Sequence, residues 1–371
     1  FGKMTSSTGN ISTDVSFRPE GRGGYKIKGI VNGQGIALGK LIGEEDMLGS
    51  LSMKANLDMY ASSLKAFSGS MSGLIDSVEI NDYKYRNISL NGTFSEHTWD
   101  GSVKISEPNI KMDLLGMFDF SGQLPEFDFT LNLAEADLYR LKLAKDTSAE
   151  VSVLLTANFK GSNIDNLDGE IKLLNSNLTL KGNDLEFYDF SLRTFSEDYK
   201  PAISLRTDYV DADVRGYYNF SGLENTVRSV MATLMPSRFT APPKTRNPRN
   251  RFTFDISFKN TDKINNFFNT GLLISEKSTL RGSIFPDSIL LITANFKLLN
   301  FRNNILKDVS VEAVYTSPYS QVKINSASLT AMGQTELKGF RIDLLAEPDN
   351  FRLNLNWDNH DKIKNSGNIT A

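Results

Sequence analysis

Apolar and polar residues alternate at a period of two along most of the chain. Clear runs begin at Phe127 (FDFTLNL), Phe252 (FTFDISF) and Leu290 (LLITANFKL). Successive side chains of a β-strand point to opposite faces, so each run places its large apolar residues on one face and mostly polar residues on the other. The pattern predicts an all-β protein of antiparallel strands with one continuous apolar face.

Turn residues and one amphipathic segment punctuate this pattern. We expect turns at Asn32-Gly33, Asn91-Gly92 and Lys181-Gly182-Asn183, at a spacing of roughly 8–12 residues. Residues 223–235 carry apolar positions on one helical face and are followed by Pro236, which predicts a helix that ends there. A shorter helical turn is expected at 136–143.

An internal repeat of about one hundred residues accompanies the alternation. Four segments align without gaps from Tyr25, Phe127, Phe252 and Phe351, so 102, 125 and 99 residues separate their starts. We predict one continuous array made of repeat A (1–126, core from about 25), repeat B (127–251), repeat C (252–350) and the start of repeat D (351–371). Repeat B is longer because it holds an insertion, the helix and a basic loop at 222–251. A repeat of this length predicts about 8–10 strands.

Shorter matches recur at a similar spacing. Asn87, Asp189 and Asp308 each open an equivalent four-residue string, as in NISL and DFSL. The carboxylates of Asp137, Asp262 and Asp361 stand at one offset of the long repeat, where a turn or helix-cap role is expected.

The apolar face cannot remain in water, because burying apolar surface contributes roughly 25 cal/mol per Å². The sheet could pack on a second sheet as a sandwich, close into a barrel, or curl into an open trough with an apolar guest, and periodicity does not separate these three. In the third case, the floor of the trough would be lined by Phe127, Phe129, Leu131, Phe252, Phe254, Ile256, Phe258, Leu290, Ile292, Phe296, Phe351, Leu353, Leu355 and Trp357.

Several strings resemble a known family. They are YRNISLNGTF (85–94), DLEFYDFSLRTF (184–195), the starts ANLD (55–58) and ANFK (157–160), and NTDKINNFF (260–268). Together with the insertion at 222–251, they resemble the translocation and assembly module TamB in its Bacteroidota-type form, within the AsmA-like group related to bridge-like lipid transfer proteins. The resemblance covers essentially the whole chain.

The resemblance implies a β-taco, an elongated curled open sheet with a hydrophobic groove. It also implies a protein of the periplasm, anchored in the inner membrane at its N-terminus and reaching the outer membrane. Its implied partners are phospholipid and an outer-membrane barrel protein of the BamA/TamA type, and its role is phospholipid movement or support of outer-membrane protein assembly. The chain begins and ends in mid-pattern, so we expect a middle section of such a protein.

Composition narrows the alternatives. The formal net charge is -3 and cysteine is absent, which disfavours a nucleic-acid partner and excludes disulfides and cysteine-based zinc sites. The competing hypothesis is a secreted or cell-surface β-repeat module with a dry sandwich core. An enzyme of the polysaccharide-lyase type on a parallel β-helix fits less well, because such helices repeat every 20–30 residues or so.

Catalytic and cofactor chemistry has few candidates. The two histidines, His97 and His360, lie in different repeats, and NGQGIALG (32–39) lacks the Lys-Ser/Thr of a phosphate-binding loop. The acidic cluster at 208–213 (DYVDAD) lacks the spacing of a calcium loop. We therefore expect no enzyme activity, metal or cofactor. The basic loop at 237–251 is interpreted as solvated, with contact to anionic lipid headgroups as the alternative.

Overall fold

The computed structural model describes residues 2–6, 8–20, 23–62, 67–243, 250–285, 289–360 and 365–371. Within these residues the chain forms 23 β-strands and a few short helices, which confirms the all-β prediction. Its contacts divide it into unit 1 (1–162 and 169–188) and unit 2 (163–168 and 189–371).

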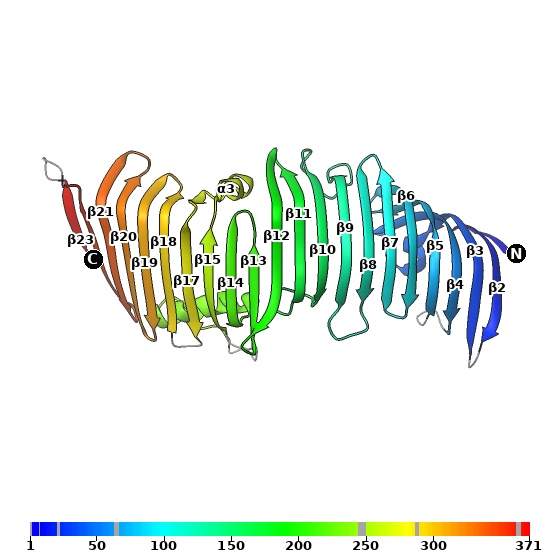
Figure 1. The fold of residues 1–371 in the computed structure, drawn as a ribbon, viewed down its shortest axis with the longest axis horizontal. Coiled ribbons are helices and arrows are strands. Elements are labelled where there is room, and N and C mark those ends of the chain that lie inside the picture. Colours follow the sequence, from blue (N-terminus) through cyan, green and yellow to red (C-terminus); the bar gives the residue numbers. More distant parts are fainter. Residues whose placement is uncertain are drawn as a thin grey trace. The chain divides into compact units, whose positions relative to one another are not determined.

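Unit 1 holds the strands of the N-terminal half, drawn from blue to green in Figure 1. From β1 to β10 each strand pairs antiparallel with the next strand in the chain. The strands are β1 (Gly2–Ser6), β2 (Gly9–Glu20), β3 (Gly24–Ala37), β4 (Leu48–Ala61), β5 (Phe67–Ile80), β6 (Tyr83–Ser95), β7 (Thr98–Glu107), β8 (Ile110–Asp119), β9 (Glu126–Asp137), β10 (Glu150–Lys160), β11 (Asp168–Leu180) and the start of β12 (Asn183–Glu197).

Unit 2 continues the same antiparallel pattern, and only the three-residue β16 is bypassed when β15 pairs with β17. After β12 its strands are β13 (Lys200–Arg206), β14 (Val210–Tyr217), β15 (Arg251–Phe258), β16 (Leu272–Ile274), β17 (Ser278–Phe285), β18 (Ile289–Phe301), β19 (Asn304–Thr316), β20 (Tyr319–Ala331), β21 (Thr335–Glu347), β22 (Asn350–Asp358) and β23 (Ser366–Thr370). Among the described residues, β1 pairs only with β2 and β23 only with β22, so neither unit closes into a barrel.

The strands are longer and fewer than the turn signals predicted. Asn32-Gly33 lies inside β3 and Asn91-Gly92 inside β6, so both turn predictions are wrong, whereas Lys181-Gly182 does form the turn between β11 and β12. Gly92 serves packing instead: a Cβ added there would lie 2.6 Å from Nε1 of Trp99. Successive aligned segments start six strands apart from β3 to β9 and from β9 to β15, and seven strands apart from β15 to β22. The predicted spacing was about 8–10 strands.

Many strands are bent along their length. Asn87 (φ 52°) and Asp308 (φ 45°) adopt the left-handed conformation inside β6 and β19, where one or two residues drop out of the pairing while the register is kept. Asn and Asp tolerate this conformation better than most residues, which explains their match in the sequence. Gly116 in β8 has φ 152°, and a Cβ there would lie 2.2 Å from the backbone oxygen of Asp128. Only glycine fits such a kink, and kinks and bulges curve a sheet.

The helices are short: α1 (Leu38–Ile42), the 3-10 turn η1 (Phe220–Gly222), α2 (Leu223–Leu234) and α3 (Asp262–Phe268). The predicted helix at 223–235 is confirmed as α2. Of the stretch 136–143, the first two residues end β9 and residues 138–143 form turns, with the amide of Leu141 donating to the carbonyl of Asp137 (3.0 Å). Of the basic loop, residues 244–249 lie outside the described residues. The aligned segments start in β3, β9, β15 and β22, and the division into repeats stays a prediction.

Candidate functional site

One face of unit 2 carries an uninterrupted line of apolar side chains. We call this face of the strands the inner face, and the line the unit 2 apolar row. Each member is the register partner of the next, across eleven strands. From β12 to β23 the row is Leu192, Leu205, Ala212, Ile256, Leu280, Ala294, Val311, Ile324, Ile342, Leu355 and Ile369.

On the opposite, outer face of the same strands, the line of register partners next to the apolar row consists entirely of polar residues. A shift of one residue moves every side chain to the other face, so this second line follows directly from strict alternation. It consists of Arg193, Ser204, Asp213, Asp255, Arg281, Thr293, Glu312, Lys323, Asp343, Asn354 and Thr370. Opposite charges meet within it, as where Nε of Arg281 lies 2.8 Å from a carboxylate oxygen of Asp255.

Unit 1 has its own apolar row. It runs over nine strands, from β2 to β10, and consists of Ile11, Gly33, Met53, Ile75, Ile88, Ile105, Met112, Leu133 and Val153. Gly33 does not interrupt this row, because the side chain of Ile36 fills the space beside it. A Cβ added at Gly33 would lie 2.3 Å from Cδ1 of Ile36.

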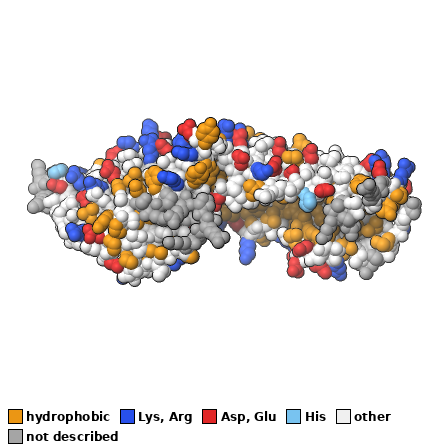
Figure 2. Space-filling model, turned by 90° about the horizontal axis from the view of Figure 1, so that it is seen from below, with side chains coloured by type: hydrophobic (Ala, Val, Ile, Leu, Met, Phe, Trp, Pro, Cys, Tyr) orange, Lys and Arg blue, Asp and Glu red, His pale blue; other side chains and the backbone are white. Residues whose placement is uncertain are grey.

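Near one end of the unit 1 strands, the inner face is aromatic. Register partners on β6 to β10 form an aromatic ladder of Phe94, Trp99, Phe118, Phe127 and Phe159. Ring centroids are 5.5 Å apart for Trp99–Phe118 and 4.8 Å for Phe127–Phe159. Figure 2 looks at the strand ends and shows hydrophobic side chains in a hollow to the right of centre, on the side of the unit 1 strands.

All fourteen residues predicted to line a floor lie on an inner face. Three lie in unit 1 and eleven in unit 2. Those in unit 1 are Phe127, Phe129 and Leu131 on β9, and those in unit 2 are Phe252, Phe254, Ile256 and Phe258 on β15, Leu290, Ile292 and Phe296 on β18, and Phe351, Leu353, Leu355 and Trp357 on β22. Their role in binding lipid stays a prediction.

The side chains of the inner faces are partly exposed. In the unit 2 apolar row only Ala294 is buried, Ile369 is 51% exposed, and the others are intermediate. A second sheet packed about 10 Å away would bury such a row completely. The whole chain exposes 22,879 Å², whereas two compact domains of half its mass would expose about 17,800 Å². The fold therefore defines a class: open antiparallel sheets with one accessible apolar face.

Helix α2 crosses one end of the inner face in unit 2. Leu234 packs with Tyr315 and Ala346, which belong to β19 and β21, and Val230 and Leu290 join this cluster. At about 1.5 Å per residue, the twelve-residue helix is some 18 Å long, enough to cross about four strands.

Both ends of α2 are fixed by a carboxylate. Asp165 accepts hydrogen bonds from the Phe220 amide (2.6 Å) and from the Ser221 hydroxyl (2.5 Å). At the other end, Asp349 donates its amide to the Leu234 carbonyl (2.9 Å) and accepts from the Ser237 hydroxyl (2.6 Å). We call α2 with these two attachments the strap.

In unit 1 the opposite ends of the strands are covered by the turns after β9. Leu141, 1% exposed, packs with Ile110 and Ala136. Beside this cluster Glu107 is only 7% exposed, and Tyr83 donates a hydrogen bond to its carboxylate (3.0 Å). Burial raises the pKa of Glu107 above its usual value, although the bond from Tyr83 acts in the opposite direction. This end is a sealed core.

Sequence reasoning missed the aromatic ladder and the strap. Trp99 and Phe118 alternate with polar or small neighbours as the other lining residues do, but Gly101 and Gly116 interrupt the apolar pattern of β7 and β8. Periodicity predicted α2 itself but contains no information on where the helix docks.

Neither the histidines nor the acidic cluster at 208–213 belongs to a group of metal ligands among the described residues. His97 and His360 are exposed, and no group of three potential metal ligands is present in the described part of the chain. The acidic cluster is paired internally: Asp208 accepts from the Asp189 amide, Asp211 pairs with Lys259, and Asp213 pairs with Arg206.

The recurring carboxylates differ in their roles. Asp137 accepts a hydrogen bond from the Arg140 amide (2.8 Å), so the predicted turn-cap role is confirmed there. Asp262 is the first residue of α3 and follows the N-cap Thr261. Asp361 lies outside the described residues.

Comparison with known proteins gives no further guide. No protein-family model, curated protein or solved structure matches this chain. None of the described helices is both long and apolar enough to cross a membrane.

Proposed function

We propose that the inner faces of the two units bind the acyl chains of phospholipids, and that the chain is a section of a TamB-like protein of the periplasm. In this role it conducts lipid toward the outer membrane, supports outer-membrane protein assembly, or both. An inner-membrane anchor and an outer-membrane barrel protein complete the proposal, and no residue is assigned a catalytic role. These partners rest on the sequence resemblance.

The observation that carries the lipid proposal is the unit 2 apolar row. Its eleven members follow one another without a polar residue, yet all except Ala294 keep part of their surface exposed. Each CH₂ group buried on such a surface contributes about 0.8 kcal/mol, so an acyl chain is held without specific polar contacts. The polar headgroup stays in water beyond the rim.

The competing function, a binding or structural module with a dry sandwich core, has less support. It requires large side chains that are buried on both sides, as in any close-packed interior. Single inner-face side chains such as Phe252 and Phe340 are buried (both 5% exposed), but the large side chains of the unit 2 apolar row are not.

A charge on the inner face tests the proposal. Ile256→Glu in β15 is expected to lower the phospholipid that co-purifies with the protein about tenfold or more, because a carboxylate does not tolerate contact with acyl chains. Lipid is measured by extraction and mass spectrometry, and by binding of a fluorescently labelled phosphatidylethanolamine.

The matched control is Thr253→Glu on the outer face of the same strand, opposite Arg215, which should keep wild-type lipid content. Circular dichroism establishes that both variants fold. Wild-type protein without lipid, or loss of folding in Ile256→Glu alone, would overturn the proposal in favour of a dry core.

A further inference from the structure

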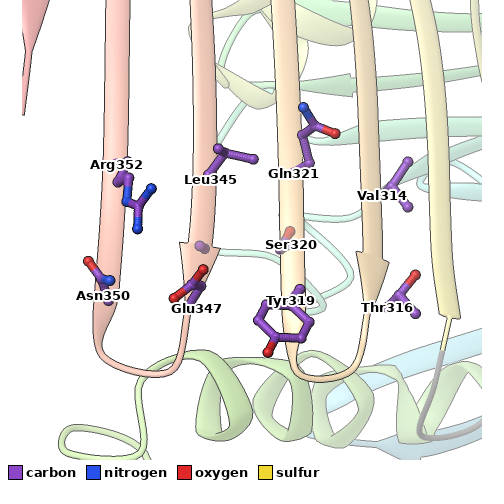
Figure 3. Close-up of a pocket in the computed structure, with 10 residues that line it drawn as sticks. Val314, Thr316, Tyr319, Ser320, Gln321, Leu345, Glu347, Asn350 and Arg352 are labelled. Atoms are coloured by element: carbon purple, nitrogen blue, oxygen red, sulfur yellow. The ribbon is translucent and has the colours of Figure 1, made fainter.

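A shallow pocket opens in unit 2, mainly on the outer face of the strands. Its volume is about 300 Å³, and it lies at the ends of β19, β20, β21 and β22 beside their turns (Figure 3). The register partners Val314, Gln321, Leu345 and Arg352 form its base across the four strands. These four residues and most of the other lining residues belong to the outer face, but two inner-face positions, Ser320 and Ala346, also border the pocket.

Its lining combines a small apolar base with many groups that form hydrogen bonds. Val314 and Leu345 are 43% and 45% exposed, and Tyr319 stands at the lip with 58% of its surface exposed. Around them lie the outer-face polar side chains of Thr316, Gln321, Glu347, Asn350 and Arg352. The structure gives none of these five side chains a hydrogen-bond or ion-pair partner within the described part of the chain.

The chemistry of the lining excludes several ligand classes. A pocket of this size is at the lower limit for small-molecule sites, and its polar wall does not suit an acyl chain. A peptide cannot add as an extra strand, because β19 to β22 are each paired on both sides. A phosphate or other anion is disfavoured because the single Arg352 shares the pocket with Glu347.

A saccharide satisfies the remaining requirements. Its hydroxyl groups both donate and accept hydrogen bonds, as do the amides of Gln321 and Asn350, while Arg352 donates and Glu347 accepts. The exposed ring of Tyr319 and the two aliphatic side chains offer flat apolar contact to the C–H face of a sugar ring. Opposite charges on Glu347 and Arg352 favour a ligand that is neutral as a whole.

We propose that this outer-face pocket binds a neutral saccharide unit, with Tyr319 stacking on the sugar ring. The groups that would contact the sugar, Tyr319, Gln321 and Arg352, lie on the outer face and not in the unit 2 apolar row, so this site does not depend on the proposed lipid function.

Binding is tested on the whole chain with maltotetraose, cellotetraose and chitotetraose. We expect saturation-transfer NMR to detect at least one of them at millimolar concentration, with signals on ring protons. Tyr319→Ala should weaken this binding about fivefold or more, since most of the flat contact is lost. Gln321→Leu should weaken it as well, and its exposed outer-face position makes it safe for folding.

Tyr139→Ala is the matched control, because it removes another exposed tyrosine (46%) from unit 1. It should leave saccharide binding unchanged, and all three variants should keep wild-type lipid content. The proposal is overturned if none of the three oligosaccharides binds, or if Tyr319→Ala and Gln321→Leu bind as the wild type does. Failure of lipid binding alone would leave this result intact.

Discussion

Each unit has an apolar inner face, but the ends of the strands are covered by different elements in the two units. In unit 1, an aromatic ladder over kinked strands leaves the hollow beside it open, and the far strand ends are sealed around Leu141. In unit 2 the apolar row is aliphatic, and the strap, a separate helix fixed by Asp165 and Asp349, crosses one end of the inner face.

This difference separates what alternation dictates from what individual residues add. The apolar rows need only a period of two and matched hairpins, so both units have them. The ends depend on single features, a glycine kink in unit 1 and two carboxylate attachments in unit 2. Four predictions test this comparison, at Gly116, Asp165, Glu107 and Arg281. Hydrogen exchange measures the local stability of each unit separately.

The largest effect is expected from Gly116→Val in unit 1. The added side chain would meet the backbone oxygen of Asp128, and φ of 152° disfavours any residue but glycine. We expect a loss of about 3 kcal/mol in unfolding free energy, measured by urea denaturation. Gly182→Val is the control: φ is 70° and no atom lies within 4 Å, so it should cost only about 1 kcal/mol. Equal costs would show that the kink is not needed.

The strap of unit 2 is tested by Asp165→Ala. Loss of the bonds to the Phe220 amide and the Ser221 hydroxyl should destabilise this end of the helix by about 2 kcal/mol, which makes amide exchange in α2 roughly thirtyfold faster. Exchange in unit 1 should not change. Asp343→Ala on the outer face is the control, and wild-type exchange in α2 of the Asp165 variant would contradict a fixed strap.

The sealed end of unit 1 gives a pH dependence through Glu107. Because burial raises its pKa in the folded state, the stability from its protonated form is present below the unfolded value near 4.5. That stability is lost as pH rises through the higher folded pKa. Glu107→Gln stays neutral, so its unfolding free energy relative to wild type should increase with pH over this window.

Tyr83→Phe sharpens the same test. The hydrogen bond from Tyr83 lowers the pKa of Glu107, so its removal should raise that pKa further and move the loss of stability to higher pH. A difference between Glu107→Gln and wild type that does not vary with pH would contradict this account of the sealed end.

The smallest effect is expected on the outer face. Arg281 and Asp255 are 2.8 Å apart, but their side chains are 62% and 41% exposed, so water and salt screen the pair. Arg281→Ala should change the unfolding free energy by no more than about 0.5 kcal/mol and leave lipid content unchanged. A larger loss would mean that the polar face contributes more to the sheet than its exposure implies.

The sequence predicted which face of a strand each side chain occupies far better than it predicted where the strands begin and end. Residues such as Phe254 and Leu353 were assigned to the correct face because period-two alternation holds wherever a strand begins or ends. The turns at Asn32-Gly33 and Asn91-Gly92 were wrong because glycine also serves where a neighbouring side chain covers the backbone, as Trp99 covers Gly92.

The candidate site was predictable only in part. The rows depend on register, which shifts at irregularities such as those between Gly33 and Ile36 and between Lys111 and Met112, and single-sequence periodicity does not locate them. The attachment of α2 joins Ser237 to Asp349, 112 residues apart, through side chains with no local signature. Contacts of this kind require the folded chain.

The pairing of strands that follow one another in the chain has an evolutionary consequence. Removal of β20 and β21 together would set Leu355 against Val311, apolar against apolar, because both deleted strands carry the same alternation. Such a sheet gains or loses length in hairpin steps without exchanging its two faces. Gene duplication or deletion of a hairpin therefore adjusts reach while the surface chemistry is conserved.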